Sequence, residues 1–541
     1  MVMADRDRAS MFERVRAVLE WIALLLILAV AGYLRLANVA STPGWYSDEG
    51  TIINIAENLM QGKIQYFAIG QSMLLEARMP LFPLILSRLF LVWGVRTEVL
   101  RALTGCLGVL STGLLYVAVR RAQRSTESSL ALISAGLFAV YPSAVLYSRI
   151  GFSYNLLTPL VILALLGLWE YLLTCKRVWL MFAALSVGLG ALSDLMALTL
   201  ALPLVVVVST RRWRDLLLGV PAMGLPLALY VGIMMSTAPS AFLFDLRFTL
   251  GRLGSIPLVA QFPVAMLNFA GLLGRDFWIP VGVIGLFMLQ PLRLQRLVIL
   301  VLMLPLFSLA RSTTSIYGLG FYYVSPLFPL IALGMASLVR FGTPVVVSTL
   351  RGGLNELFSL WRWPAYPEFM GNMRHGAVTL LSALALFAFI VAPFLIPMFT
   401  NAYLIQHGIL EAGEEITMSQ LLIDPKDAVA VAGFVNDHSR PDDLVVASPA
   451  WAWLIDAHVA DFQQSVAWRG GETLHFPTNV PRDRFEFDVD YLNARFVIVD
   501  NAWRNWAVRV MPTVREMVDR VETWAIAYKQ GEIVVYQAPG P

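Results

Sequence analysis

Two adjacent acidic residues mark the most chemically informative segment of this 541-residue chain. Asp48 and Glu49 lie in GWYSDEGT, residues 44–51, shortly after the first long apolar stretch. A carboxylate in such a place can act as a general base. The same pattern is typical of a solvated helix N-terminus capped by Ser47 or Asp48, because the helix dipole favours acids there. Two carboxylates do not complete a cation site, so metal use by Asp48 and Glu49 is left open.

The loop that carries the acidic pair, residues 41–97, also holds cations and an apolar segment. Lys63 and Arg78 lie in this loop, and Arg78 begins the apolar segment RMPLFPLILSRLFLVWG. This segment is shorter than the ~18 to 20 apolar residues that a transmembrane helix needs, and Arg88 interrupts it. We therefore expect a helix that lies in the membrane interface. A long loop with acids, cations and an interfacial helix indicates a site that handles an amphiphile.

Further candidate groups follow along the chain. Arg149 in YSRIGFSYN comes directly after an apolar stretch and lies close to Tyr147 in sequence, which suits either a binding residue or an arginine that snorkels to the interface. Arg247 and Arg311 are among the few other cations expected on the same side of the membrane. Asp194 separates two short apolar segments, and an ionisable group in such a place is a functional candidate.

The composition requires apolar surroundings for most of the chain. Hydrophobic residues make up 58% and charged residues 14% of the sequence, against about 45 to 50% and about 25% in an average soluble domain. An ordinary cytosolic enzyme is therefore excluded. The positive charges lie in short clusters between apolar runs, so no nucleic-acid partner is expected. Cys106 and Cys175 are the only cysteines, which excludes a disulfide framework and a Cys/His zinc motif.

Charge and hydropathy divide the chain near residue 400. Residues 1–400 carry a net charge of +12 and residues 401–541 a net charge of −9. Apolar runs before residue 400 predict about eleven transmembrane helices. The predicted spans are 21–40, 98–119, 128–147, 154–173, 178–193, 195–209, 215–235, 277–292, 297–310, 319–339 and 377–399. The first run could instead be a signal peptide, although Arg35 interrupts the approach to the small-residue site NVAS.

Basic clusters predict how the spans are oriented, because Lys and Arg accumulate in short cytoplasmic loops. With the predicted spans, every cluster falls on the side of the N-terminus. The clusters include Arg14 and Arg16, Arg120 and Arg121, Lys176 and Arg177, Arg211 and Arg212, and Arg293 and Arg296. We therefore expect a plasma-membrane protein with a cytoplasmic N-terminus, and with residues 41–97 and 401–541 outside the cytoplasm.

Residues 401–541 have the pattern of a small α/β domain. Strands are predicted at 444–448, 494–500 and 532–537, and helical spacing is found in DPKDAVAVAGFVNDH and PTVREMVDRVETW. This part has no glycine-rich phosphate loop, so a binding or covering role is favoured. The predicted architecture is thus an α-helical multi-pass membrane part, residues 1–400, followed by an extracytoplasmic α/β domain.

The order of several motifs resembles the polytopic GT-C-type glycosyltransferases that use a polyprenyl-phosphate sugar, including protein O-mannosyltransferases and the aminoarabinose transferases that modify lipid A. The resemblance covers most of residues 21–340. It rests on LRL followed by SDEG, on RMPLFPLIL, on LRALTGCLGVLSTGLLYVAVRR, on YPSAVLYSRIGFSYNLL and on GFYYVSPLFPLIAL.

This resemblance implies transfer of a sugar from a polyprenyl-phosphate donor to a hydroxyl of a protein, lipid or glycan. Asp48 would be the base that takes the acceptor's proton, and Glu49 would orient the site or contact the sugar or a metal ion. The phosphate partners would be Lys63, Arg78 and Arg149, with Arg247 and Arg311 in reserve. The substrate path would be lined by Tyr147, Asp194, Tyr322 and Tyr323, although an interfacial aromatic role suits the two adjacent tyrosines equally well.

Two departures from the family pattern affect the expected phosphate site. Related transferases often have a lysine near the position of Asp194 and an arginine just before the tyrosine that corresponds to Tyr322, where this chain has Phe321. Each change removes a potential phosphate partner. A transporter and a non-catalytic membrane subunit with a binding domain are the alternatives. The transporter is less favoured, because transporter binding sites usually lie at the membrane midplane, whereas the acidic pair of this chain lies in a long loop.

Overall fold

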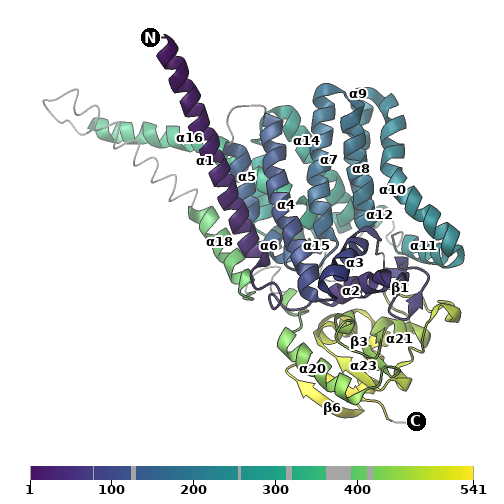
Figure 1. Ribbon diagram of the computed structural model, residues 1–541. Coiled ribbons are helices and arrows are strands. Elements are labelled where there is room, and N and C mark those ends of the chain that lie inside the picture. Colours follow the sequence, from purple (N-terminus) through teal and green to yellow (C-terminus); the bar gives the residue numbers. More distant parts are fainter. Residues whose placement is uncertain are drawn as a thin grey trace.

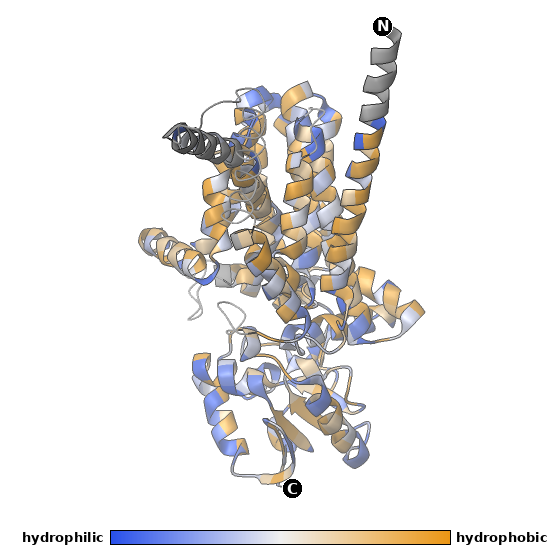
Figure 2. Cartoon of the chain, turned by 90° about the vertical axis from the view of Figure 1, so that its left-hand side faces the viewer, coloured by the Kyte–Doolittle hydropathy of each residue, from blue (hydrophilic) through white to orange (hydrophobic). Residues whose placement is uncertain are grey.

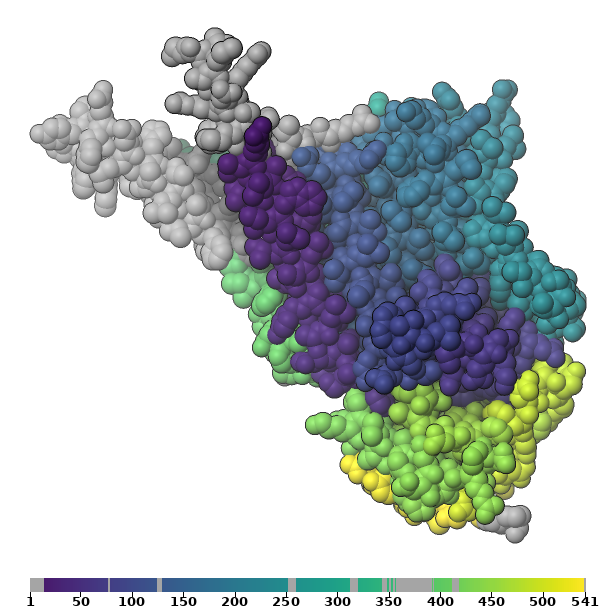
Figure 3. Space-filling view, in the orientation of Figure 1, coloured from purple at the N-terminus to yellow at the C-terminus, as the bar shows by residue number. Residues whose placement is uncertain are grey.

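The computed structural model describes residues 2–76, 78–123, 129–253, 258–311, 320–360, 392–410 and 418–539. Upright helices form the membrane part, and the C-terminal domain lies against one end of them (Figure 1). The first loop, residues 41–97, lies between these two parts, as the space-filling view shows (Figure 3).

The membrane part is built from apolar helices of very different lengths. They are α1 (Val2–Leu36), α4 (Thr97–Gln123), α5 (Ser129–Val140), α6 (Pro142–Ser148), α7 (Tyr154–Thr174), α8 (Arg177–Ser193), α9 (Ala201–Arg212), α10 (Leu216–Thr237), α12 (Leu258–Arg275), α13 (Trp278–Leu286), α14 (Leu292–Ala310), α15 (Phe321–Val324), α16 (Phe328–Leu360) and α18 (Ala392–Gln406). Apolar residues dominate these helices and hydrophilic ones are more frequent in the C-terminal domain (Figure 2). Large apolar side chains are exposed on them, including Leu25, Leu217, Leu229 and Ile233, as a lipid-facing surface requires.

Within the described residues, six stretches are long and apolar enough to cross a membrane, or eight if two bent helix pairs each form one span. The bent pairs are α5 with α6, at 59°, and α12 with α13, at 108°. Helix α8 matches the predicted span 178–193 but has only 17 residues, and the predicted spans 195–209 and 215–235 fall in one apolar stretch, Leu195–Thr237. Most of the predicted span 377–399 lies outside the described residues. The multi-pass helical architecture is confirmed, and the count of eleven stays a prediction.

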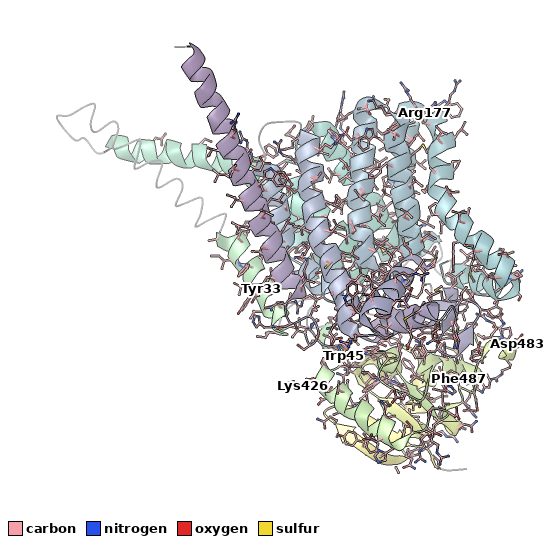
Figure 4. All side chains as sticks on the ribbon, in the orientation of Figure 1. Tyr33, Trp45, Arg177, Lys426, Asp483 and Phe487 are labelled. Atoms are coloured by element: carbon pink, nitrogen blue, oxygen red, sulfur yellow. The ribbon has the colours of Figure 1, made fainter. Side chains whose placement is uncertain are left out.

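Basic residues gather at the end of the helices that is remote from the C-terminal domain, where Figure 4 labels Arg177. Three ion pairs tie neighbouring helices together there. They join Arg120 to Glu20 at 3.1 Å, Arg121 to Glu170 at 2.7 Å and Arg177 to Asp215 at 3.1 Å. Arg120, Arg121 and Arg177, which belong to two of the predicted basic clusters, therefore lie at one end of the bundle.

The first loop folds into two short helices and a hairpin. It contains α2 (Ser47–Met60), β1 (Gln65–Tyr66), β2 (Ile69–Gly70), the 3₁₀ turn η1 (Leu74–Glu76) and α3 (Leu81–Trp93). Helix α3 is the predicted interfacial segment. It packs Phe82, Leu86 and Phe90 against the apolar face of α2 and exposes Trp93. A helix is therefore present at the expected segment and supports α2 from one side, and its place in the membrane interface stays a prediction.

The C-terminal domain is a five-stranded mixed sheet of order β4-β3-β5-β7-β6. The strands are β3 (Leu444–Ala447), β4 (His458–Asp461), β5 (Phe496–Val499), β6 (Ala525–Gln530) and β7 (Ile533–Gln537). Strands β4, β3 and β5 are parallel, whereas β7 and β6 are antiparallel to their neighbours. The predicted strands correspond to β3, β5 and β7, and β4 and β6 were not predicted.

Helices cover both faces of this sheet. Side chains alternate along each strand, so apolar strands present apolar side chains on both faces. Helix α20 (Pro425–His438) shares a core with Val445 and Ile498, whereas α21 (Phe462–Trp468) and α23 (Pro512–Val521) share a second core with Val446 and Val499. Both predicted helical segments, α20 and α23, are thus confirmed.

The first loop and the C-terminal domain form a common core. Trp45, Tyr66 and Ile69 of the loop are buried in the same apolar cluster as Val431 and Trp451 of the domain. Trp45, labelled at the junction in Figure 4, exchanges both backbone hydrogen bonds with Ile423 at 2.9 Å. A Cβ built on Gly50 of α2 would lie 1.7 Å from the carbonyl oxygen of Pro449, so only glycine permits this close approach. The domain is therefore fitted to the helix that carries the acidic pair.

Candidate active site

Asp48 and Glu49 occupy the first turn of α2, as one of the two interpretations of GWYSDEGT predicts. The N-cap is Tyr46 rather than Ser47 or Asp48. Glu49 reaches back to this cap, since its Oε2 accepts the backbone N–H of Tyr46 at 2.9 Å. The two acids nevertheless have different surroundings.

Glu49 is completely buried and fully engaged. Arg101 of α4 donates from Nε to Oε1 at 2.7 Å and from Nη2 to Oε2 at 2.6 Å, and both side chains have 0% exposure. The backbone N–H of Gly151 adds a bond to Oε1 at 2.8 Å. Arg101 also donates to the carbonyl oxygens of Val39, at 3.0 Å, and Gly44. This pair fixes the chain on either side of Tyr46.

Asp48 is open by comparison. Its side chain is 36% exposed, and its Oδ2 accepts a hydrogen bond from Nη2 of Arg78 at 2.7 Å. The Arg78 side chain is 10% exposed and lies between η1 and α3. The carboxylate can therefore meet a ligand, and the guanidinium beside it supplies a positive charge.

Three further predicted residues lie around this pair. Asp194, the N-cap of the 3₁₀ helix η2 (Leu195–Leu200), interacts electrostatically with Arg78. The hydroxyl of Tyr323 is within electrostatic range of both Asp48 and Asp194. The rings of Tyr322 and Tyr323 lie 4.3 Å apart, so these tyrosines form one wall. The structure thus brings together five of the predicted site residues.

A cation also reaches the segment in which the family arginine is missing. The guanidinium of Arg275, at the end of α12, lies 4.9 Å from the ring centroid of Phe321. Such a distance is typical of a cation–π contact. A positive charge from another helix therefore lies beside position 321.

Lys63 is not brought to the acidic pair. It follows the C-terminal end of α2, whereas Asp48 lies at the N-terminal end, and at 1.5 Å per residue about 18 Å of helix separates them. The residue is exposed. The structure gives no support to Lys63 as a phosphate partner of this site.

Arg149 is fully buried and holds three segments together. Its Nη1 donates to the carbonyl oxygen of Leu34 at 2.8 Å, and its Nη2 donates to Thr42 and, at 3.5 Å, to the carbonyl oxygen of Gln406. Arg35 has a similar role, since it donates to the carbonyl oxygens of Phe138 and Ala139 at 2.9 and 2.6 Å. Carbonyls at helix ends carry partial negative charge, which suits these arginines. Neither the binding role nor the snorkelling role expected for Arg149 matches this arrangement.

The other two reserve cations point elsewhere. Arg247 lies on the exposed face of α11 (Pro239–Leu253), whereas Phe242 and Asp245 of that helix are buried. Arg311 is exposed at the end of α14, and its Nη1 donates to Gln261 at 3.0 Å. The structure places neither of them beside Asp48.

Tyr147 lies one layer below the wall of tyrosines. It is 1% exposed, and its ring is 6.1 Å from that of Phe152, which in turn stacks on Tyr322 at 5.4 Å. Tyr147 also lines a cavity of about 10 Å³ with Ser148 and Asn155. A cavity of this size holds at most about one water molecule, so Tyr147 supports the wall rather than the substrate path.

A metal ion does not fit the acidic pair as it is arranged. Both oxygens of Glu49 already accept hydrogen bonds, which leaves Asp48 as a single carboxylate ligand. Among the described residues, no group of three or more His, Cys, Asp or Glu side chains is placed to hold a metal.

Sequence reasoning missed three residues that belong to this region: Arg101, Tyr66 and Asp461. Arg101 lies inside an apolar span, and an ionisable residue there is a signal that could have been used. Tyr66 of the first loop donates its hydroxyl to Asp461 of the C-terminal domain at 3.0 Å. No sequence signal connects residues 395 positions apart.

Solved structures share this architecture. ArnT from Cupriavidus metallidurans bound to undecaprenyl phosphate aligns with a TM-score of 0.59 and 15% identity, over 96% of this chain and 99% of that one. The apo form of the same protein gives 0.60 and 13%, over 97% and 100%. The Archaeoglobus fulgidus oligosaccharyltransferase in complex with Zn and sulfate gives 0.50 and 13%, over 91% and 70%.

No protein-family model matches the chain, and no curated protein matches it at a significant level. At these identities the structural likeness establishes the fold and leaves the activity to be argued from the site. The chain has the GT-C-type fold of polytopic membrane glycosyltransferases.

Proposed function

We propose that this protein is a membrane glycosyltransferase that moves a sugar from a polyprenyl-phosphate donor to an acceptor hydroxyl at the outer face of the membrane. The observation that carries the proposal is the exposed carboxylate of Asp48, paired with Arg78 at the end of a GT-C-type helical bundle. The neighbouring acid, Glu49, forms a buried ion pair with Arg101 and therefore has a structural role.

The proposed reaction is a single displacement at the anomeric carbon. The Asp48 carboxylate takes the proton of the acceptor hydroxyl, and the acceptor oxygen forms a bond to the anomeric carbon. The bond from that carbon to the phosphate oxygen breaks, and polyprenyl phosphate leaves with the electron pair. Attack opposite to the leaving group inverts the anomeric configuration. A base in this position typically contributes about 10²- to 10⁴-fold to the rate.

Arg78 is the proposed partner of the donor phosphate. Its guanidinium is 2.7 Å from Asp48 and interacts with Asp194, which supports the proposal that it meets the negative charge developing on the leaving group. A planar guanidinium can donate two parallel hydrogen bonds to phosphate oxygens, which a lysine cannot do. Arg149 is no longer proposed for this role, because it is fully buried and both of its terminal nitrogens donate to oxygens of the protein.

Tyr322 and Tyr323 are proposed to line the path of the sugar or the lipid. Their rings form a wall that continues to Tyr154, whose ring is 5.3 Å from that of Tyr323. Asp194 is proposed to orient Arg78 rather than to contact phosphate, since two anions would repel. The acceptor is a hydroxyl of a protein, lipid or glycan, and undecaprenyl phosphate bound to a similar fold supports a lipid-linked donor.

The proposed orientation has the basic end of the bundle in the cytoplasm. The clusters of Arg120, Arg121 and Arg177 share the end remote from the C-terminal domain, and such clusters are favoured on the cytoplasmic side. Residues 41–97 and 401–541 then lie outside, where a lipid-linked donor presents its sugar to the site.

The transporter alternative is not favoured. Transporters bind substrates at broken helices near the membrane midplane. The break between α5 and α6 is filled by Arg35, which donates to the carbonyl oxygens of Phe138 and Ala139. The break between α12 and α13 is filled by Asp276, which accepts from Tyr141 at 3.0 Å and Ser143 at 2.6 Å. Protein side chains thus occupy both breaks.

Asp48→Asn tests the proposal. The amide keeps the shape of the side chain but cannot accept the proton, so we expect transfer to fall by about 10²- to 10⁴-fold with unchanged folding. The purified protein in nanodiscs is supplied with undecaprenyl-phosphate pentoses and hexoses and a membrane lipid extract. Release of undecaprenyl phosphate is measured under single-turnover conditions.

Glu57→Gln, on the same helix, is the matched control and should keep wild-type turnover. Wild-type rates in Asp48→Asn would remove this residue from the role of base. Inactivity of the wild-type protein with every donor and acceptor would contradict the proposed function itself.

A further inference from the structure

The C-terminal domain turns the chemically useful edge of its sheet toward α2. Strands β3, β4 and β5 are parallel, and ligands of such sheets bind at the carboxyl ends of the strands. Pro449, just after β3, touches Gly50 of α2, and Asp461 ends β4. The loops at the carboxyl ends of the domain's strands therefore face α2, the helix that carries Asp48. In other parallel sheets, loops at this edge bind ligands.

Asp461 is the acid at this edge that reaches the first loop. Its Oδ2 accepts the hydroxyl of Tyr66 at 3.0 Å, and this hydroxyl lies 3.4 Å from Oγ1 of Thr51. Thr51 follows Asp48 by three residues in α2, so the two side chains lie on the same face of the helix. The hydroxyl groups of Tyr66 and Thr51 thus connect the carboxylate of Asp461 to α2, the helix that carries Asp48.

The surroundings of Asp461 lack solvent. Asp461, Tyr66 and Thr51 are exposed by only 1%, 2% and 1%. Burial and the nearby negative charge of Asp48 raise the pKa of Asp461 to about 7, although hydrogen bonds from the backbone N–H of Gln463 and from Tyr66 oppose the shift. His475 is a further titratable side chain at this network, and its Nδ1 lies 3.2 Å from the amide nitrogen of Gln463.

A purely structural role explains only half of these contacts. Oδ1 of Asp461 caps α21 by accepting the N–H of Gln463 at 2.6 Å, as many helix N-caps do. Oδ2 is directed away from that helix and toward the first loop. A helix cap uses only one carboxylate oxygen, so the cap does not explain why the second oxygen contacts the first loop.

We propose that Asp461 is a positioning residue for the transfer: a carboxylate contributed by the C-terminal domain that acts on Asp48 through Tyr66 and Thr51 and through its own charge. The inference rests on the proposed function of Asp48. When Asp48 takes the acceptor's proton, one of two neighbouring carboxylates is neutralised, and their mutual repulsion is relieved. The domain thereby contributes to proton transfer in addition to covering the site.

The coupling can be measured without turnover, by infrared titration of the full-length protein in nanodiscs. The carboxyl band that disappears in Asp461→Asn belongs to Asp461, and it should titrate near neutral pH in the wild type. Removal of the neighbouring charge in Asp48→Asn should lower this midpoint by about one pH unit, the size that defines a coupled pair. Equal midpoints in the two proteins would overturn the proposal.

Turnover gives the second test. Asn is a good helix cap, so Asp461→Asn should fold and melt like the wild type. We expect its kcat to fall by about tenfold, the equivalent of one pK unit of coupling, with an unchanged KM for the undecaprenyl-phosphate donor. Tyr66→Phe should reduce kcat without adding its full effect to that of Asp461→Asn, because the two residues act in series.

Asp490→Asn is the matched control. Asp490 also caps a short helix of the domain, at 3.1 Å from the N–H of Leu492, but it precedes β5 and so lies at the opposite edge of the sheet. Its kcat should equal that of the wild type. A wild-type kcat in Asp461→Asn, or fully additive effects with Tyr66→Phe, would contradict the proposal. Full activity in Asp48→Asn would contradict the proposed function, and the infrared coupling would still report on the pair.

Discussion

Two neighbouring ion pairs start from adjacent residues of one helix and end in different environments. Glu49 and Arg101 are both 0% exposed, whereas Asp48 is 36% and Arg78 10% exposed. The buried pair is joined by two bonds of 2.7 and 2.6 Å, and the other pair by one bond of 2.7 Å. The first pair is closed to ligands and the second is open to them.

The difference shows how one acidic motif divides two tasks. A buried pair contributes little net stability, yet removal of one partner leaves an uncompensated charge in an apolar place. Arg101 therefore acts as the fixed point of residues 39–49, since it also holds Val39 and Gly44. Asp48 has no such set of bonds to lose, and its carboxylate is free to change partners during a reaction.

The largest effect is expected from Arg101→Leu, which separates the two pairs most sharply. The buried carboxylate of Glu49 would lose its counter-charge, at a cost of about 3 to 5 kcal/mol in the free energy of unfolding. Thermal unfolding in detergent and the yield of folded protein measure this loss. Arg96→Leu, at an exposed arginine just before α4, should behave like the wild type.

A second substitution sharpens this result. In the double variant Glu49→Gln with Arg101→Leu no unpaired charge is buried, so part of the stability should return. An Arg101→Leu protein that unfolds at the wild-type temperature would show that the buried pair does not organise the loop.

An intermediate effect is expected from Arg149→Lys, because this arginine belongs to the closed region. Lysine keeps the charge but cannot donate to Leu34, Thr42 and Gln406 from one planar group. Buried carbonyl groups that lose a partner should cost about 1 to 3 kcal/mol of stability. Transfer per folded molecule and the affinity for undecaprenyl phosphate should stay unchanged. A stable Arg149→Lys protein with weaker binding of undecaprenyl phosphate would return Arg149 to the phosphate site.

Local patterns predicted most of the fold. Apolar runs indicated the helical membrane part, a short apolar stretch with Arg88 indicated α3, and short runs rich in valine and isoleucine indicated β3, β5 and β7. Strands β4 and β6 were missed, since HVAD has only two apolar residues between His458 and Asp461, and AIAYKQ forms a strand with no buried residue. The count of spans depends on helix bends and on residues outside the described ranges.

The site was predicted less completely, because it depends on contacts between distant segments. Asp48 and Arg78 were singled out from one loop, although not as a pair, and the two tyrosines from the resemblance to a known family. The burial of Arg149 could not, since it follows from Leu34 and Gln406, which are remote in sequence. Charge and position suggest that a residue can bind a ligand, and only packing shows whether its donors are already used.

The smallest effect, and the most specific, is expected from Arg78→Lys. Lysine keeps a positive charge near Asp48, so the free energy of unfolding should change by no more than about 0.5 kcal/mol. The planar fork that matches two phosphate oxygens is lost, and we expect single-turnover transfer to fall by about tenfold, or about 1.4 kcal/mol of transition-state stabilisation. Thermal unfolding and release of undecaprenyl phosphate measure the two quantities on the same sample. This variant reverses the result expected for Arg149→Lys, which loses stability and keeps activity. If Arg78→Lys transfers sugar at the wild-type rate, a point charge is sufficient there, and bidentate phosphate binding has to be sought at Arg275 above Phe321.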